Sequence, residues 1–270
     1  METNFNEIKQ EILRRAKEAR ACKHEYGRAY AAKNLSELSQ VIKDNFYWVC
    51  TQGVLTVDLI EQYKEDFSAN DIYANQDVER GYLLCDSATV RAYGNTIVKA
   101  YGNSKVEAYG NAKVEAFNST SVRAYDSTMI QANNNVTVKA FDDSKVDAYD
   151  CATVIAYDDS IVEAFNNSIV DACDNTTVKA YCKATVEAHN YATVEAYDSA
   201  KVEACDISTI RAFDNTSITV CNNVTVEAYG NAYCTSYNTI DCKLFNYAIY
   251  HVLGTNTIYY ADSDLKFVKQ

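Results

Sequence analysis

The chain has 270 residues, of which 48% are hydrophobic and 23% charged, and this composition is that of a globular protein rather than a disordered one. It contains no proline, 8 glycines and 22 tyrosines, so nearly every backbone N–H is available as a hydrogen-bond donor, as an extensive sheet requires. The formal charge of -12 argues against direct binding to nucleic acid or to an anionic membrane surface.

Residues 1–84 carry no repeat and are predicted to form an α-helical domain of three helices. Apolar residues such as Ile8 and Ile12 recur at helical spacing in the first helix. A second helix begins at the N-cap residue Asn34, which has a glutamate three residues later, and a third begins near Thr56. We expect this domain to cap the open N-terminal edge of the repeats that follow.

Basic residues concentrate between positions 14 and 33, where seven Lys and Arg face two Glu. One interpretation is a solvated helix face. The other is a docking site for an acidic partner, for nucleic acid, or for the acidic repeats of a second copy. The candidate residues of this basic patch are Arg14, Arg15, Lys17 and Arg20.

From Cys85 to Ile258 the sequence repeats every eight residues with the consensus V-x-A-Y-(G/D/N)-N-(S/A/T)-x. The valine slot holds Val or Ile in 18 of 20 octads, the alanine slot holds Ala in 17, and the next slot is aromatic in 15. The small residue, the Val and the Ala lie at spacing two, which predicts an inward strand face with charged residues pointing to water between them. The Gly, Asp or Asn that follows the aromatic residue predicts a corner.

One octad cannot bury its apolar face alone, so stacking into a parallel β-solenoid is predicted, and the fold class is mainly β. The aromatic slot is broken at Asn133 and then at Cys173, His189, Cys205 and Cys221, and the last four are 16 residues apart. With two octads per coil they form one continuous ladder, whereas three octads per coil would scatter them. The sequence therefore predicts 16-residue coils, about 11 in number at about 4.8 Å each.

Facing sheets about 10 Å apart leave no room for a ring in every coil, so the aromatic residues are predicted to stack along an edge or an outer face. Such a stripe would be apolar and exposed, as interfaces are. The candidate binding residues of the aromatic ladder are Tyr93, Tyr101, Tyr109, Phe117, Tyr125, Phe141, Tyr149 and Tyr157.

Aspartate recurs in the corner slot after the aromatic residue. Because stacked carboxylates repel, a row of them indicates either a corner residue interchangeable with Gly and Asn or a surface that mimics the charge of nucleic acid. Lysines between the corners dilute this charge. The candidate acidic-corner residues are Asp126, Asp142, Asp150, Asp158, Asp174, Asp198, Asp206 and Asp214.

The ten cysteines include no CxxC pair and follow no export signal, so free thiols are expected. The ladder of Cys173, His189, Cys205 and Cys221 is the best candidate for metal chemistry, but four rungs spread the ligands too far for one tetrahedral ion, and no metal is expected. No run of 18 apolar residues and no signal peptide is apparent, which predicts a cytoplasmic protein without membrane contact. Residues 259–270 are predicted to form a C-terminal cap strand with protective lysines.

The octad, with its A-Y-G-N segments and 16-residue higher period, resembles the tandem repeats of bacterial ice-nucleation proteins and, more distantly, those of pentapeptide-repeat proteins and bactofilins. The resemblance covers about two thirds of the chain and implies a parallel β-solenoid with stacked tyrosines. In some members it also implies lateral self-association. Ice binding is not expected, because ice-binding surfaces resemble outward T-x-T ladders, whereas here the slot two residues after each small Ser or Thr holds the inward valine.

No phosphate-binding glycine loop, GxSxG or HExxH motif is present, and the unbroken octads provide no inserted loops for a catalytic cleft. We therefore expect neither an enzyme nor a cofactor. The leading hypothesis is a rigid scaffold that forms a homodimer or higher homo-oligomer, or docks a protein partner, through its aromatic ladder. The alternative is an acidic decoy that inhibits a nucleic-acid-binding enzyme, for instance a phage or mobile-element anti-defence protein, a behaviour that the likeness to pentapeptide-repeat inhibitors implies.

Overall fold

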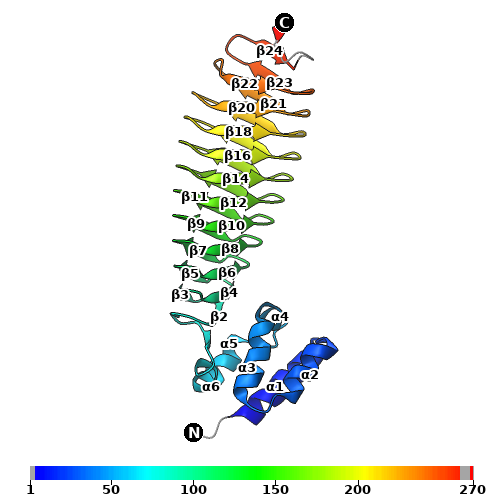
Figure 1. Ribbon diagram of the computed structural model, residues 1–270, viewed down its shortest axis with the longest axis vertical. Helices are drawn as coiled ribbons and strands as arrows, with labels where there is room; N and C mark the ends of the chain where they lie inside the picture. The colour runs from blue at the N-terminus through cyan, green and yellow to red at the C-terminus, as the bar shows by residue number, and fades with distance from the viewer. Residues whose placement is uncertain (1–3, 262–267, 270) are drawn as a thin grey trace.

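A computed structural model of the chain describes residues 4–261, 268 and 269. Helices gather at the N-terminal end, and a long rod of stacked strands rises from them (Figure 1). Within the described residues, no helix is both long enough and apolar enough to cross a membrane.

The N-terminal region contains six helices in the described part of the chain, where the sequence predicts three. Asn34 caps the second predicted helix by accepting the N–H of Glu37 at 2.9 Å. That helix is interrupted at Asn45 and the third predicted helix at Tyr63, which have φ of -118° and -119°. The helices are α1 (Phe5–Glu18), α2 (Lys23–Ala31), α3 (Leu35–Asp44), α4 (Phe46–Thr51), α5 (Val57–Gln62) and α6 (Lys64–Ser68).

The rod consists of two sheets, and consecutive octads alternate between them. Sheet A contains the even-numbered strands up to β22 together with β1. Its strands are β1 (Ile72–Ala74), β2 (Tyr82–Asp86), β4 (Ile97–Tyr101), β6 (Lys113–Ala116), β8 (Met129–Ala132), β10 (Lys145–Ala148), β12 (Ile161–Ala164), β14 (Thr177–Ala180), β16 (Thr193–Ala196), β18 (Thr209–Ala212), β20 (Thr225–Ala228) and β22 (Asp241–Leu244).

Sheet B contains the odd-numbered strands from β3 together with β24. Its strands are β3 (Thr89–Ala92), β5 (Lys105–Ala108), β7 (Ser121–Ala124), β9 (Thr137–Ala140), β11 (Thr153–Ala156), β13 (Ile169–Ala172), β15 (Thr185–Ala188), β17 (Lys201–Ala204), β19 (Ser217–Val220), β21 (Tyr233–Ser236), β23 (Ile249–Val252), β24 (Thr257–Tyr260) and β25 (Val268–Lys269).

From β3 to β23, each strand pairs in parallel with the strand 16 residues away, as Val146 and Val162 show. This confirms the predicted parallel β-solenoid with two octads per coil, and the parallel coils run from β2 to β23. At the C-terminal end, β24 pairs antiparallel with β23, and β25 pairs antiparallel with β24. Most of the predicted cap strand, at residues 262–267 and 270, lies outside the described residues.

The interior holds the predicted small, Val and Ala positions, which are almost fully buried except at Ala88 and Ile240 near the two ends of the rod. Hydroxyl groups in the small slot fit this narrow space because many of them bond the corner of their own coil. The Thr120 Oγ1 hydroxyl, for example, donates to the Phe117 carbonyl at 2.7 Å, and Ser104 does the same to Tyr101. Burial of these polar groups is therefore offset by a local hydrogen bond.

The corners contain one residue whose backbone lies in the left-handed region. Asp126, Asp142 and Asn166 have φ between 55° and 59°, and Gly110 has φ of 71°. Asn, Asp and Gly tolerate this conformation better than other residues, which explains their predominance in the slot. Cys182 occupies one such corner with φ of 59°.

The helical region joins the rod at Lys99 in β4, whose side chain is only 1% exposed. Its Nζ donates to the Tyr47 carbonyl at 2.9 Å and to Thr51 Oγ1 at 2.5 Å, both in α4. It also lies 3.1 Å from Glu115 Oε2 and 5.0 Å from the centre of the Phe117 ring. The buried ammonium thus joins α4 to the outer face of sheet A.

Candidate functional site

The aromatic side chains form two stacked columns, one along each edge of the rod. The predicted set of eight residues is divided between them, because successive octads turn at opposite edges. Edge 1 is the edge at which the chain turns after each strand of sheet A, and edge 2 is the edge at which it turns after each strand of sheet B. Ladder 1 consists of Tyr101, Phe117, Tyr149, Phe165, Tyr181, Tyr197, Phe213, Tyr229 and Phe245, and ladder 2 consists of Tyr93, Tyr109, Tyr125, Phe141 and Tyr157.

Rings in both ladders stack nearly parallel. Tyr109 and Tyr125 lie 4.9 Å apart at 5°, and Phe165 and Tyr181 lie 5.0 Å apart at 7°. All the ladder rings are partly exposed, so one face of each column borders on solvent. Ladder 1 runs without a break over seven coils from Tyr149. The ladders are therefore rigid, partly exposed apolar stripes with a period of one coil.

Tyrosine hydroxyls in the ladders lean toward the outer face of the sheet of their own coil. The hydroxyl of Tyr109 donates to Glu107 at 3.3 Å, and that of Tyr197 donates to Glu195 at 3.1 Å. Burial is the largest cause that raises the pKa of both phenols, and their glutamate neighbours add to it. These tyrosines therefore stay neutral donors at physiological pH.

The predicted acidic corners also divide between the edges: Asp150, Asp198 and Asp214 lie on edge 1, and the other five lie on edge 2. Many of them accept a backbone hydrogen bond from the corner one coil earlier. Oδ2 of Asp126 accepts the N–H of Gly110 at 2.8 Å, and Oδ2 of Asp198 accepts the N–H of Cys182 at 2.9 Å. The carboxylate thus links consecutive coils, which offsets the repulsion expected for a row of like charges.

A continuous stretch of edge 2 nevertheless carries uncompensated acidic charge. Its six carboxylates span four coils, and none of them forms an ion pair with a described residue. This acidic stripe consists of Asp126, Asp142, Asp143, Asp158, Asp159 and Asp174.

Beyond Tyr157, the column of ladder 2 continues as Cys173, His189, Cys205 and Cys221, in the order predicted from the sequence. Cys205 and Cys221 form a disulfide with a Cα–Cα distance of 4.9 Å, which corrects the expectation of free thiols at these two positions. The spacing of one coil was the available signal, since it places two Cα atoms within disulfide range. His189 Nε2 lies 3.8 Å from Asp171 Oδ1.

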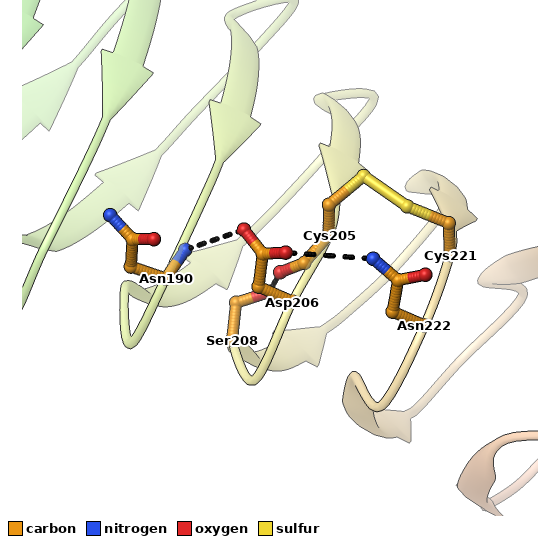
Figure 2. Close-up of a disulfide and its surroundings, with 6 residues drawn as sticks. All are labelled: Asn190, Cys205, Asp206, Ser208, Cys221 and Asn222. Carbon is orange, nitrogen blue, oxygen red and sulfur yellow. Dashed lines mark hydrogen bonds between the residues drawn. A yellow bond between two sulfur atoms is a disulfide. The ribbon is translucent and has the colours of Figure 1, made fainter.

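The corners beside this disulfide are held together by Asp206. Oδ2 of Asp206 accepts the N–H of Asn190 at 3.2 Å, and Oδ1 accepts Nδ2 of Asn222 at 3.5 Å. Figure 2 shows the carboxylate between these two corners, with the disulfide alongside. Three successive coils are thus linked through a single side chain.

A groove of about 470 Å³ lies along the same corners. Its apolar walls are Tyr191 and Ile207, which are 62% and 54% exposed. These two residues occupy corner positions that elsewhere are mostly Asn, Asp or Ser, a departure from the repeat that sequence analysis did not use. The remaining lining residues are Asn190, Asp206, Asn222 and Asn223.

The predicted basic patch is partly neutralised within α1. Arg14 bonds both Glu11 and Glu18, and Arg15 bonds Glu11. Hydrogen bonds from Arg14 and then Arg15 lower the pKa of Glu11 to about 2. Lys17 and Arg20, the other candidates, form no ion pair with a described residue.

The chain matches no known family model, no curated protein sequence and no solved structure. The structure shows the fold, which is a parallel β-solenoid of about 11 turns with coils of ~16 residues.

Proposed function

We propose that the protein is a non-enzymatic rigid scaffold that assembles with a second copy of itself through its aromatic ladders, principally through ladder 1. The observation that carries this proposal is the unbroken stack of seven partly exposed rings from Tyr149 to Phe245. Long exposed apolar stripes on soluble proteins usually mark interfaces.

The period of the ladder favours a second copy as the partner. Neighbouring rings are 4.4–5.1 Å apart over this stretch, which is close to the spacing of hydrogen-bonded strands. A rigid surface with this repeat packs along its whole length only against a surface of the same repeat, and another copy provides one. The resemblance of the octad to ice-nucleation repeats, which implies lateral self-association in some members, supports the same reading.

The test is the oligomeric state of ladder variants, measured by sedimentation velocity or light scattering. Asparagine is a suitable replacement, because the chain itself carries Asn133 in a ladder 1 slot. We expect the triple variant Tyr149→Asn, Tyr181→Asn and Tyr197→Asn to be a folded monomer, where the wild type is a dimer or larger.

The matched control places the same change on edge 2, as Tyr93→Asn, Tyr109→Asn and Tyr125→Asn. This variant is expected to retain most of the association. A wild-type protein that stays monomeric at the highest soluble concentration would overturn the proposal, as would a ladder 1 variant that associates like the wild type. Circular dichroism of both variants checks that the coils remain folded.

The acidic stripe favours a second candidate function, that of a decoy for a nucleic-acid-binding enzyme. Its six carboxylates lack cationic partners among the described residues, so a basic surface would complement them. Replacing Asp126, Asp142, Asp158 and Asp174 by Asn tests this candidate, because Asn preserves an acceptor oxygen at each corner. Salt-sensitive inhibition of a captured nucleic-acid enzyme that disappears in this variant would support the decoy, and inhibition that the variant retains would exclude it.

A further inference from the structure

The disulfide between Cys205 and Cys221 belongs to neither proposal, and its surroundings suggest chemistry of its own. It replaces the ring pairs of ladder 2 on an exposed edge of the rod rather than in the core. Cys221 is exposed and Cys205 partly so. Exposed disulfides are the ones that thiols attack readily, whereas structural disulfides resist reduction.

We propose that Cys205–Cys221 is a reversible thiol–disulfide exchange site for a cysteine-containing peptide that lies in the adjacent groove. Tyr191 and Ile207 would contact an apolar side chain of the peptide, and the asparagines of the groove would bond its backbone. The groove thus presents two apolar side chains beside four polar ones, which offers contacts both to an apolar side chain and to the backbone of a peptide.

Exchange begins when the thiolate of the peptide attacks Sγ of Cys221, which is the more exposed residue of the two. A bond forms between the two sulfurs, the Cys205–Cys221 bond breaks, and its electron pair goes to Sγ of Cys205. A second thiol of the peptide then attacks the mixed disulfide and releases Cys221. The peptide leaves with one disulfide formed, and the cysteine pair is reduced to two thiols, so two electrons pass to the protein.

His189 lies in the adjacent rung of the column, because β15 pairs with β17 in the register Ala188 to Ala204. Acidic residues occur on these rungs: Asp171 Oδ1 lies 3.8 Å from Nε2 of His189, and Glu187 and Glu203 stand two residues before His189 and Cys205. A thiolate departing at Cys205 is disfavoured among these charges, so a proton donor beside it accelerates exchange. His189 fills this role in the proposal.

Two features make the reaction reversible without loss of the fold. Asp206 bonds the corners on both sides, at Asn190 and Asn222, so three coils keep their register when the S–S bond opens. The third cysteine of the column does not compete, because burial and then Asp171 raise the pKa of Cys173 to about 11. Its thiol is therefore protonated at neutral pH and is a poor nucleophile.

The experiment follows reduction of the disulfide in a background in which Cys22, Cys151 and Cys182, the other exposed thiols, are replaced by Ser. The probes are glutathione and a synthetic dithiol peptide, Cys-Leu-Cys, and alkylation with mass spectrometry reports the product. We expect full reduction by either probe with unchanged circular dichroism, and at least tenfold faster reduction by the peptide. Ile207→Ser should remove this preference, and His189→Gln should slow both reactions about tenfold.

Single-cysteine variants identify the attacked sulfur. With Cys205→Ser, an activated glutathione disulfide should form a mixed disulfide at Cys221 rapidly, and with Cys221→Ser the reaction at Cys205 should be at least tenfold slower. The proposal is overturned if the disulfide survives prolonged exposure to both probes, if its reduction unfolds the coils, or if the peptide shows no advantage that Ile207→Ser removes. Oligomeric state is not a readout here, so failure of the ladder proposal would be recognised separately.

Discussion

The backbone N–H of Asp126 donates to Oδ2 of Asp142, 2.9 Å away and one coil further along edge 2. Asp142 in turn donates its N–H to Oδ2 of Asp158 at 3.2 Å. Each carboxylate thus satisfies the corner of the preceding coil, so the corner aspartates act as links between coils as well as carriers of charge.

This link predicts different outcomes for two replacements of Asp142. Asp142→Ala removes the acceptor and places alanine, which has no polar side chain to support the left-handed backbone, at φ of 55°. We therefore expect a loss of about 2 kcal/mol in unfolding free energy. Asp142→Asn preserves an acceptor and tolerates the left-handed backbone, so it should cost less than about 0.5 kcal/mol. Urea unfolding of the two variants checks this, and equal losses would contradict the role of the carboxylate oxygen as a link.

Asn133 is the one gap inside ladder 1, between Phe117 and Tyr149. Asn133→Tyr should complete the stack and add two ring pairs, each worth about 0.5–1.5 kcal/mol, against the loss of a hydrogen bond to Ala116 at 3.3 Å. We expect a higher melting temperature. The control is Asn135→Tyr, an exposed corner position outside the ladder, which should leave the melting temperature unchanged; a similar rise in both variants would argue against stacking as the cause.

Gly110 occupies a corner at φ of 71°, and an added Cβ would lie 3.2 Å from the backbone of Gly94 in the preceding coil. Gly110→Ala should therefore destabilise the rod by about 1–3 kcal/mol. Gly27 in α2 is the matched control, because an added Cβ there meets nothing within 4 Å and alanine favours helix, so Gly27→Ala should raise stability by up to about 1 kcal/mol. Differential scanning calorimetry compares the two, and a neutral Gly110→Ala would be inconsistent with close stacking of the corners.

Loss of the Lys99 side chain is expected to weaken the junction between the helical region and the rod. Lys99→Met leaves the carboxylate of Glu115, 17% exposed, without its cation, and should cost about 3 kcal/mol. Adding Glu115→Gln should recover part of this loss, because the uncompensated charge is removed. Lys113→Met, at an exposed position on the next strand of sheet A, is the control and should be nearly neutral. Chemical denaturation measures the unfolding free energy of all three variants. Equal losses for Lys99→Met and Lys113→Met would contradict the role of Lys99 as a link between the helical region and the rod.

The ion pairs of Glu11 in α1 are expected to make the stability of the folded chain fall at acid pH. Its pKa is lowered from 4.5 to about 2 in the folded chain by Arg14 and Arg15, so its ion pairs stabilise the folded state above pH 4.5 and are lost as the pH falls toward 2. Solvent screening keeps this effect small. The difference in melting temperature between the wild type and Glu11→Gln should therefore be largest at neutral pH and shrink between pH 4.5 and 2, and a difference that stays constant with pH would contradict the ion pairing.

The architecture was predictable because one period controls it. The inward Val and Ala positions, the left-handed corners and the 16-residue coil all follow from spacing within the octad, and the interruptions at Cys173 and His189 identified the two-sided coil. The division of the aromatic residues between two edges follows from the same coil.

Features that depend on single side chains were harder to predict. The breaks at Asn45 and Tyr63 lie inside continuous apolar patterns, and α2 buries only Ala29, so its helical period is weak. The role of Lys99 as a buried link could not be predicted, because it occupies a slot that faces solvent in other octads. To predict the disulfide would have required a second assumption, namely that two cysteines one coil apart are oxidised.

The register of 16 residues underlies the ladders, the corner links and the disulfide, and pairwise cysteine cross-linking tests it most directly. In the double variant Tyr109→Cys and Tyr125→Cys, the two thiols should oxidise rapidly to an intramolecular disulfide that peptide mapping identifies, as Cys205 and Cys221 do further along the same edge. In Tyr109→Cys and Phe117→Cys, eight residues apart and on opposite edges, no such disulfide should form. Efficient cross-linking of the second pair, or none of the first, would contradict the two-sided coil.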